Sequence, residues 1–247
     1  MPPLAADRCG PGLDLYCLPY AGGSAAIYRS WTNAISPDIA AKAIELPGRG
    51  RRFAEPPTRD LRALVATLMD QIDLRAGRPF AFFGHSMGAL LAFELARAVR
   101  RESRRTPIFL FVSACRAPQV RRRDEPRHTW SDARLIDELR RLNGTPAELL
   151  DNEELLGLLL PVLRADLGIC DGYRYEPEPP LDCPILAFGG LEDEQVSATE
   201  IAAWSEQTRT RFDLQMLPGD HFFLNASQSL LLQAINAHLA WPARQRA

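Results

Sequence analysis

The chain has 247 residues, of which 46% are hydrophobic and 24% are charged, and its formal net charge is -2. That length suits one large domain, or one domain with an inserted segment, and the composition is ordinary for a globular protein. The charge gives no overall attraction to nucleic acid, and no run of about 18 apolar residues predicts a membrane span.

The cysteines and the N-terminus indicate the cellular compartment. The five cysteines show no CxxC or other metal-binding spacing, and the first ten residues have no basic start followed by an apolar stretch. Thiols without a disulfide framework are typical of a reducing compartment, and no secretory signal peptide is predicted. We therefore expect a cytoplasmic protein without a metal site. We also expect a monomer that needs no cofactor.

Apolar runs typical of buried parallel strands alternate with amphipathic stretches typical of helices. The first part of the chain predicts, in order, a strand at Leu13–Pro19, a helix at Ala25–Ile35, a strand at Ala40–Leu46, a helix at Asp60–Leu74, a strand at Pro79–Gly84, a helix at Met87–Arg101 and a strand at Pro107–Ala114. Between residues 116 and 180 only helical pieces are predicted, at Asp132–Leu142, Pro146–Leu150 and Asn152–Asp166. The alternation resumes with a strand at Pro184–Gly190, a helix at Ala198–Thr208, a strand at Phe212–Leu217 and a helix at Ser227–Trp241.

This alternation predicts an α/β fold, with a mostly parallel sheet and helices on both of its faces. Residues 1–115 and 181–247 would form that core. Residues 116–180 would form a helical insertion over one end of the sheet, in the position of a lid.

The pentad Gly84–Gly88 (GHSMG) matches the pattern G-x-S-x-G and follows a predicted strand. It also opens the predicted helix at Met87, which is the strand–turn–helix setting of a nucleophile elbow. Glycines near Ser86 allow a sharp turn that presents the hydroxyl above the sheet edge. We predict that Ser86 is a nucleophile; the alternative is a glycine-rich turn with an ordinary helix-capping serine.

A serine hydroxyl needs a base that removes its proton, and the chain has four histidines. His221 follows the predicted strand Phe212–Leu217, so it should lie at the same sheet edge as the elbow. His85 should point away from the nucleophile, His128 lies in an arginine-rich stretch, and His238 is predicted at the surface. We predict His221 as the base; the alternative is a structural loop histidine.

The base in turn needs a carboxylate that fixes its tautomer. Asp193 follows the predicted strand Pro184–Gly190, and the resulting chain order of nucleophile, carboxylate and base is the order expected for an α/β-hydrolase fold. We predict Asp193 for this role. The competing loop carboxylates are Glu192, Glu194 and Asp220.

Two backbone N–H groups must stabilise the oxyanion that forms during attack. One is predicted at Met87, directly after the nucleophile. The other is predicted at Ala21, in the loop Tyr20–Ser24 (YAGGS) after the first strand, because glycines let a backbone approach a ligand closely. The alternative is a turn whose glycines serve only its backbone conformation.

Over nearly its whole length, the chain resembles the free-standing type II thioesterases of polyketide and nonribosomal peptide synthesis. The more specific segments are Leu142–Pro146 (LNGTP) and Leu160–Asp166 (LPVLRAD), since G-x-S-x-G is shared with many unrelated hydrolases. The other segments that carry the resemblance are Pro19–Ser24, Pro47–Arg49 with the arginines to Arg52, Gly84–Ala89, Cys183–Ile185, Gly189-Gly190-x-x-Asp193 and Gly219–Phe223.

This resemblance implies an α/β-hydrolase fold with a helical lid that shapes an acyl pocket. It also implies an enzyme that hydrolyses acyl groups from the phosphopantetheine thiol of acyl carrier or peptidyl carrier proteins and so removes stalled or wrongly loaded units. Ser86, Asp193 and His221 match the family's catalytic triad. The alternatives are a carboxylesterase or lipase, an acyltransferase, and a ligand-binding module without catalysis.

Two arginine clusters and one leucine-rich stretch each have two interpretations. Arg49, Arg51 and Arg52 form one cluster, and Arg121–Arg123 with Arg127 form the other. Either cluster can dock the acidic surface or the phosphate of a carrier protein, or can be ordinary surface charge. The leucine-rich residues 155–163 can line an acyl pocket or form the buried face of a helix.

Overall fold

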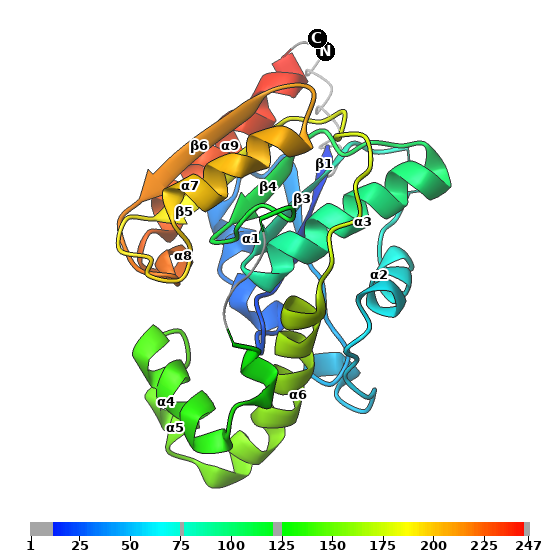
Figure 1. Cartoon of the computed structure of the whole chain (residues 1–247). Helices are drawn as coiled ribbons and strands as arrows, with labels where there is room; N and C mark the ends of the chain where they lie inside the picture. Colours follow the sequence, from blue (N-terminus) through cyan, green and yellow to red (C-terminus); the bar gives the residue numbers. More distant parts are fainter. Residues whose placement is uncertain (1–11, 75–76, 121–124, 245–247) are drawn as a thin grey trace, which may run out of the picture.

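The computed structural model describes residues 12–74, 77–120 and 125–244 (Figure 1). Within these residues, parallel strands form one six-stranded sheet with the order β2-β1-β3-β4-β5-β6. The strands are β1 (Leu13–Leu18), β2 (Ile39–Ala43), β3 (Phe80–His85), β4 (Leu110–Ser113), β5 (Ile185–Gly190) and β6 (Phe212–Leu217).

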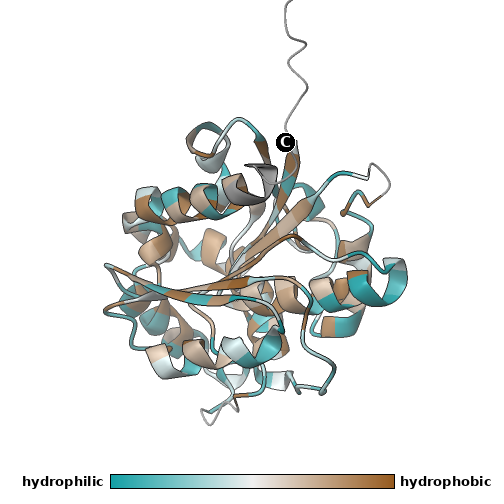
Figure 2. Cartoon of the chain, turned by 90° about the horizontal axis from the view of Figure 1, so that it is seen from above, coloured by the Kyte–Doolittle hydropathy of each residue, from teal (hydrophilic) through white to brown (hydrophobic). Residues whose placement is uncertain are grey.

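Helices cover both faces of the sheet, because successive strand side chains point to opposite faces and both sets are apolar. Phe82 and Phe83 of β3 belong to the two different core clusters that result. Figure 2 shows the apolar strands between the helical layers. One face packs against α2 (Leu61–Met69), α3 (Met87–Ser103) and α7 (Ala198–Ala202), and the other against α1 (Trp31–Ala34), α8 (Phe223–Ala226) and α9 (Gln228–Arg244).

Between β4 and β5 the chain forms a group of helices that lies away from the two chain ends (Figure 1). Leu135 packs there in a small apolar cluster with Leu160, Leu163 and Leu167. None of the described helices is both long and apolar enough to cross a membrane. The group consists of η3 (Arg127–Thr129), α4 (Asp132–Leu142), α5 (Ala147–Leu150) and α6 (Glu153–Gly172).

All the predicted strands are present, and β6 and α4 have the predicted ends. The helix predicted at Asn152–Asp166 instead continues to Gly172, with Pro161 inside it. Two other helix predictions are wrong in part. Residues 25–35 form the 3-10 turn η1 (Ala25–Tyr28) and the short α1, and residues 198–208 form α7 and the 3-10 turn η4 (Ala203–Gln207). Packing rather than propensity stabilises such short segments, so their pattern does not determine the type of helix.

Candidate active site

Ser86 lies at the sharp turn between β3 and α3. Its backbone has φ 54° and ψ −118°, outside the conformations that most residues adopt, and its N–H donates to the Ser113 carbonyl at 2.8 Å. A side chain at Gly84 would collide with the backbone of Gly88, and one at Gly88 would collide with the Leu18 carbonyl. Glycine at both positions therefore permits the close approach of strand and helix that the turn requires.

The structure brings together the three side chains predicted to form a triad. His221 Nε2 lies 3.1 Å from Ser86 Oγ, and His221 Nδ1 lies 2.9 Å from Asp193 Oδ2. The Asp193 side chain is fully buried, and its Oδ1 accepts hydrogen bonds from the N–H groups of Gln195 at 2.7 Å and Val196 at 3.3 Å. A carboxylate held in this way accepts a hydrogen bond from Nδ1–H, and in that tautomer the Nε2 lone pair is directed at the hydroxyl.

His85 hydrogen-bonds to the backbone of His221. Its Nε2 lies 2.9 Å from the carbonyl oxygen of His221, and its Nδ1 lies 2.9 Å from Ser113 Oγ. A carbonyl can only accept, so Nε2–H is the donor and the Ser113 hydroxyl donates to Nδ1. Burial lowers the pKa of His85 well below its usual value, and the neighbouring His221 lowers it further. The ring is thus neutral and, as predicted, directed away from the nucleophile.

The other two histidines lie outside this arrangement. His128 Nδ1 is 2.9 Å from Asp171 Oδ2, within the helical group. His238 was predicted at the surface, but its side chain is only 22% exposed and its ring packs edge-on against Phe109. The surface prediction therefore holds only in part, because α9 presents one side of the ring toward Phe109.

The loop after β1 contains the second predicted oxyanion donor, Ala21. Gly23 N–H donates to the Tyr20 carbonyl at 2.9 Å, and Gly22 has φ 77°, so residues 20–23 form a tight turn that favours glycine at its third position. The Gly22 N–H donates to Asp166 Oδ2 at 2.7 Å. Met87, the first predicted donor, begins α3, and the first amides of a helix have no partner within the helix.

Arg49 was predicted to belong to a surface cluster, and for this residue the interpretation is wrong. It is only 8% exposed, and its guanidinium binds both oxygens of the buried Asp166 carboxylate, at 2.6 and 2.8 Å. Arg51 is exposed, and Arg52 forms a bidentate pair with Glu55. The second cluster is only partly described, since Arg121–Arg123 lie outside the described residues.

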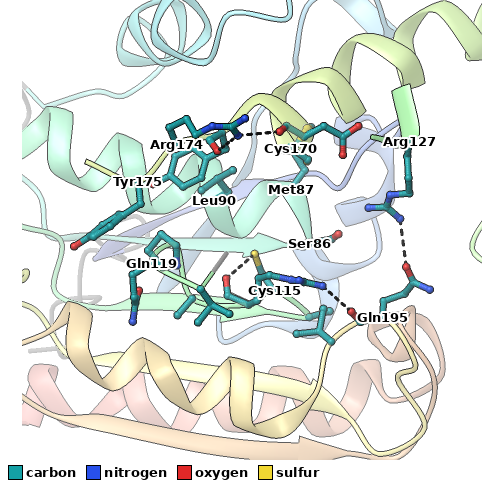
Figure 3. A pocket seen from close by; sticks show the side chains of 18 of the residues that line it. Ser86, Met87, Leu90, Cys115, Gln119, Arg127, Cys170, Arg174, Tyr175 and Gln195 are labelled. Carbon is teal, nitrogen blue, oxygen red and sulfur yellow. Dashed lines mark hydrogen bonds between the residues drawn. The ribbon is translucent and has the colours of Figure 1, made fainter. Parts of the chain in front are cut away.

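A cavity of about 710 Å³ lies beside Ser86 (Figure 3). It extends from Ser86 and His221 between the segment after β4 and the C-terminal end of α6. Figure 3 shows Arg127 hydrogen-bonded to Gln195 on one side of the nucleophile. The lining mixes apolar and charged side chains and includes Leu90, Cys115, Arg116, Arg127, Arg174 and Tyr175.

The leucine-rich residues 155–163 are absent from the described lining of this cavity. Leu160 and Leu163 are buried in the cluster between α4 and α6, whereas Leu155 and Leu158 are exposed. The buried-face interpretation therefore holds for part of the stretch. The residues that do line the cavity, such as Cys115 and Tyr175, carried no signal in the sequence, because side chains of these types occur throughout protein cores and surfaces.

Comparison with known proteins agrees with this geometry. Residues 14–239 match the family model described as the thioesterase domain. The chain therefore belongs to the thioesterase domain family, and it is a hydrolase that acts on thioesters.

The named relatives confirm the predicted resemblance to type II thioesterases and the α/β-hydrolase fold. Gramicidin S biosynthesis protein GrsT of Aneurinibacillus migulanus is 44% identical over 221 residues, which cover 90% of this chain and 86% of GrsT. The RedJ thioesterase from the prodiginine biosynthetic pathway of Streptomyces coelicolor is 38% identical, with a TM-score of 0.87 and 96% of each chain covered. The type II thioesterase BorB from the borrelidin biosynthetic cluster is 41% identical, with a TM-score of 0.84, and the match covers 95% of this chain and 94% of BorB.

Proposed function

We propose that this thioesterase hydrolyses acyl groups from the phosphopantetheine arm of carrier proteins, with Ser86, His221 and Asp193 as its catalytic triad. One observation carries the proposal: the continuous hydrogen-bonded chain from the Ser86 hydroxyl through His221 to Asp193 opens onto a cavity of about 710 Å³. Relatives named as type II thioesterases support the substrate class.

The mechanism follows from the hydrogen bonds within the triad. His221 takes the proton of the Ser86 hydroxyl while Oγ forms a bond to the thioester carbonyl carbon. Collapse of the tetrahedral intermediate breaks the C–S bond, and the thiol leaves with the proton from His221. Water then gives a proton to His221 and adds to the acyl-serine, and a second collapse releases the free acid and returns the proton to Ser86.

The oxyanion would be stabilised by the N–H groups of Met87 and Ala21. Met87 is the first residue of α3, where backbone amides point along the helix axis toward an anion. In the turn after β1, the amides of Gly22 and Gly23 are already bonded to Asp166 and to the Tyr20 carbonyl. This leaves Ala21 as the donor in that turn.

Residues 116–180 would act as a lid over the site, and residues 1–115 and 181–247 as the catalytic core. The C-terminal end of α6 already lines the cavity beside Ser86. The exposed Arg51 is a candidate for contact with an acidic carrier protein or its phosphate. Arg49 has no part in docking, because its charge is buried and paired.

The test compares hydrolysis of an acyl carrier protein thioester, the same acyl-pantetheine thioester and an aryl ester. We expect both thioesters to be cleaved in preference to the oxygen ester, and Ser86→Ala to abolish turnover while the protein stays folded. Ser205→Ala, at an exposed serine, is the matched control and should behave like the wild type. Retained turnover in Ser86→Ala would remove Ser86 from the mechanism.

The same assay separates the alternatives. Faster cleavage of the aryl ester would indicate a carboxylesterase, and transfer to an added acceptor in place of water would indicate an acyltransferase. Absence of both turnover and fluorophosphonate labelling at Ser86 would indicate a non-catalytic ligand-binding scaffold. Arg51→Glu should raise KM for the carrier-bound substrate but not for acyl-pantetheine, and equal effects on both would contradict docking at this residue.

A further inference from the structure

The buried ion pair between Arg49 and Asp166 joins two parts of the chain that meet next to the active site. Arg49 follows β2 and Asp166 lies in α6, 117 positions away. Their side chains are 8% and 2% exposed, and the guanidinium holds the carboxylate through two parallel bonds. Arginine and carboxylate make their most directional contact in this bidentate form.

The pair also binds the turn after β1 at two consecutive residues. Asp166 Oδ2 accepts the Gly22 N–H at 2.7 Å, and Arg49 Nη1 donates to the Gly23 carbonyl at 3.1 Å. The Arg49 Nε donates to the Pro47 carbonyl at 3.2 Å, which fixes the guanidinium plane. One rigid charge pair thus holds both a donor and an acceptor of the turn that contains Ala21.

The conformation of this turn needs such support. With glycine at its third position, a β-turn can flip the peptide between its two central residues at little steric cost. The bond from Gly22 N–H to Asp166 holds that peptide in one orientation. The Ala21 N–H belongs to the preceding peptide, so the ion pair acts on it by anchoring the turn and not through a direct bond. Leu163 and Leu159 of α6 also approach within 3.3 and 3.5 Å of the place where a Gly22 side chain would begin, so the turn packs directly on α6.

We propose that Arg49 and Asp166 are positioning residues that hold the Ala21 amide in place for the oxyanion, so that α6 forms part of the catalytic machinery. The proposal rests on the function proposed above. It adds that the helix bearing Asp166, which belongs to the candidate lid, sets the geometry of transition-state stabilisation. A misplaced oxyanion donor lowers the rate of the chemical step without weakening substrate binding.

The first test is Asp166→Asn, which keeps the side-chain shape but removes the charge and one acceptor oxygen. We expect kcat for acyl-pantetheine hydrolysis to fall about 10- to 100-fold, with KM changed by less than about twofold. Arg49→Lys should give a smaller loss, since an ammonium can pair with the carboxylate but cannot hold it in a bidentate fork.

The second test uses an inhibitor that mimics the tetrahedral intermediate. An alkyl boronic acid adds to the serine oxygen, and its own oxygen occupies the oxyanion position. We expect Asp166→Asn to weaken inhibition about as much as it lowers kcat, because both depend on the same donors. A residue that served only folding would not produce this proportional loss.

A double variant keeps the proposal testable if the single variants fail to fold. Removal of one partner leaves a buried charge unpaired, whereas replacement of both by apolar residues of similar volume is often tolerated. Arg49→Met with Asp166→Leu should therefore fold and still show the low kcat and weak boronate inhibition. If the double variant, or a folded Asp166→Asn, has wild-type kcat and inhibition, the pair has no positioning role and the proposal is overturned.

Arg97→Met is the matched control. Arg97 is a buried arginine of α3 that pairs with Glu94 and Glu178, away from the turn at residues 20–23. Its loss should reduce stability but leave kcat and boronate inhibition close to the wild-type values. The wild-type protein separates the two hypotheses: if it cleaves no acyl thioester, the proposed function fails, whereas wild-type rates in the variants reject only the positioning role.

Discussion

Two regions of the helical group between β4 and β5 are held to the protein in different ways. The helix α6 is joined to the β1 and β2 loops by the buried Arg49–Asp166 pair. The α4–α5 hairpin (residues 132–150) meets the sheet edge where Gly144 packs against the Phe222 ring, and through the Arg141–Glu194 ion pair, whose side chains are 47% and 81% exposed.

This difference shows that the candidate lid is not one mechanical unit. Buried, bidentate charge pairs are costly to separate, whereas exposed ion pairs contribute little to stability. The α6 helix therefore belongs to the rigid frame of the site. The hairpin rests on α6 through Leu135 and through the Arg164–Asp132 ion pair, whose side chains are 22% and 65% exposed, so we expect its movement to break fewer buried polar contacts. Among the described residues, the cavity beside Ser86 is bordered by the C-terminal end of α6 and not by the hairpin, so movement of the hairpin would leave both this border and the turn at residues 20–23 in place.

The largest difference in the free energy of unfolding is expected between variants that break the buried and the exposed ion pair. Asp166→Ala leaves the Arg49 charge buried and unpaired, so the free energy of unfolding should fall by about 3–5 kcal/mol. Glu194→Ala removes the exposed partner of Arg141 and should cost about 0–1 kcal/mol. Urea denaturation of both variants measures these losses. Similar losses for the two would mean that α6 and the hairpin are anchored alike.

Hydrogen exchange compares the two regions without mutation. We expect the backbone amides of residues 162–169 in α6 to exchange more slowly than those of residues 135–142 in α4, by on the order of 100-fold, because local opening of the hairpin breaks fewer buried contacts. Exchange detected by mass spectrometry resolves the two segments. Equal protection factors would show that both open together.

The buried side chain of His85, which hydrogen-bonds to the His221 carbonyl, should make the stability of the protein depend on pH. The pKa of His85 lies well below its usual value of 6.5 in the folded protein. As the pH falls below about 6.5, the unfolded chain therefore binds a proton that the folded protein does not, and the free energy of unfolding decreases by up to about 1.4 kcal/mol per pH unit. Above that pH this contribution is constant.

The change His85→Gln removes the titrating group, so it should flatten this part of the pH profile of stability. Denaturation of the variant and the wild type between pH 5 and about 8 measures the two slopes. Parallel profiles would show that other groups account for the loss.

A small effect is also expected at the contact between the hairpin and the Phe222 ring. A side chain at Gly144 would overlap that ring, so Gly144→Ala must push the hairpin away from the site. Because the hairpin can shift, we expect a loss of only about 1 kcal/mol, at the low end for overpacking. The free energy of unfolding and the KM for the carrier-bound substrate should be measured together. A loss as large as that of Asp166→Ala would place the hairpin in the rigid frame.

The sequence allows the strands and the three converging side chains to be predicted because their signals are local. Ser86, Asp193 and His221 each follow an apolar strand, and parallel strands bring their carboxyl ends to one sheet edge. The existence and order of the strands and longer helices could be predicted in the same way, since each depends on a periodic pattern within one segment. Their ends could not, because α2 is shorter and α6 longer than predicted.

The partners of distant charged residues could not be predicted in the same way. Arg49 stands next to two other arginines and therefore resembled surface charge, although its partner lies in α6. Asp166 belongs to the segment Leu160–Asp166 that carries the family resemblance. Its neighbours at helical spacing, Val162, Leu163 and Ile169, are apolar, which indicates a buried face but not the partner of the carboxylate. Contacts such as that of Gly144 with Phe222 depend on how separate elements pack, which local patterns do not determine.

The backbone at residue 86 also limits which side chain this fold can carry at the proposed nucleophile. A positive φ of 54° places the β-carbon in a crowded position, and a second heavy atom on that carbon, as in threonine, makes this conformation much less favourable. Serine and cysteine have a single γ atom and fit, so thiol chemistry is compatible with this elbow whereas a secondary alcohol is not. The shape of one turn thus restricts the range of acyl-transfer chemistry open to descendants of this chain.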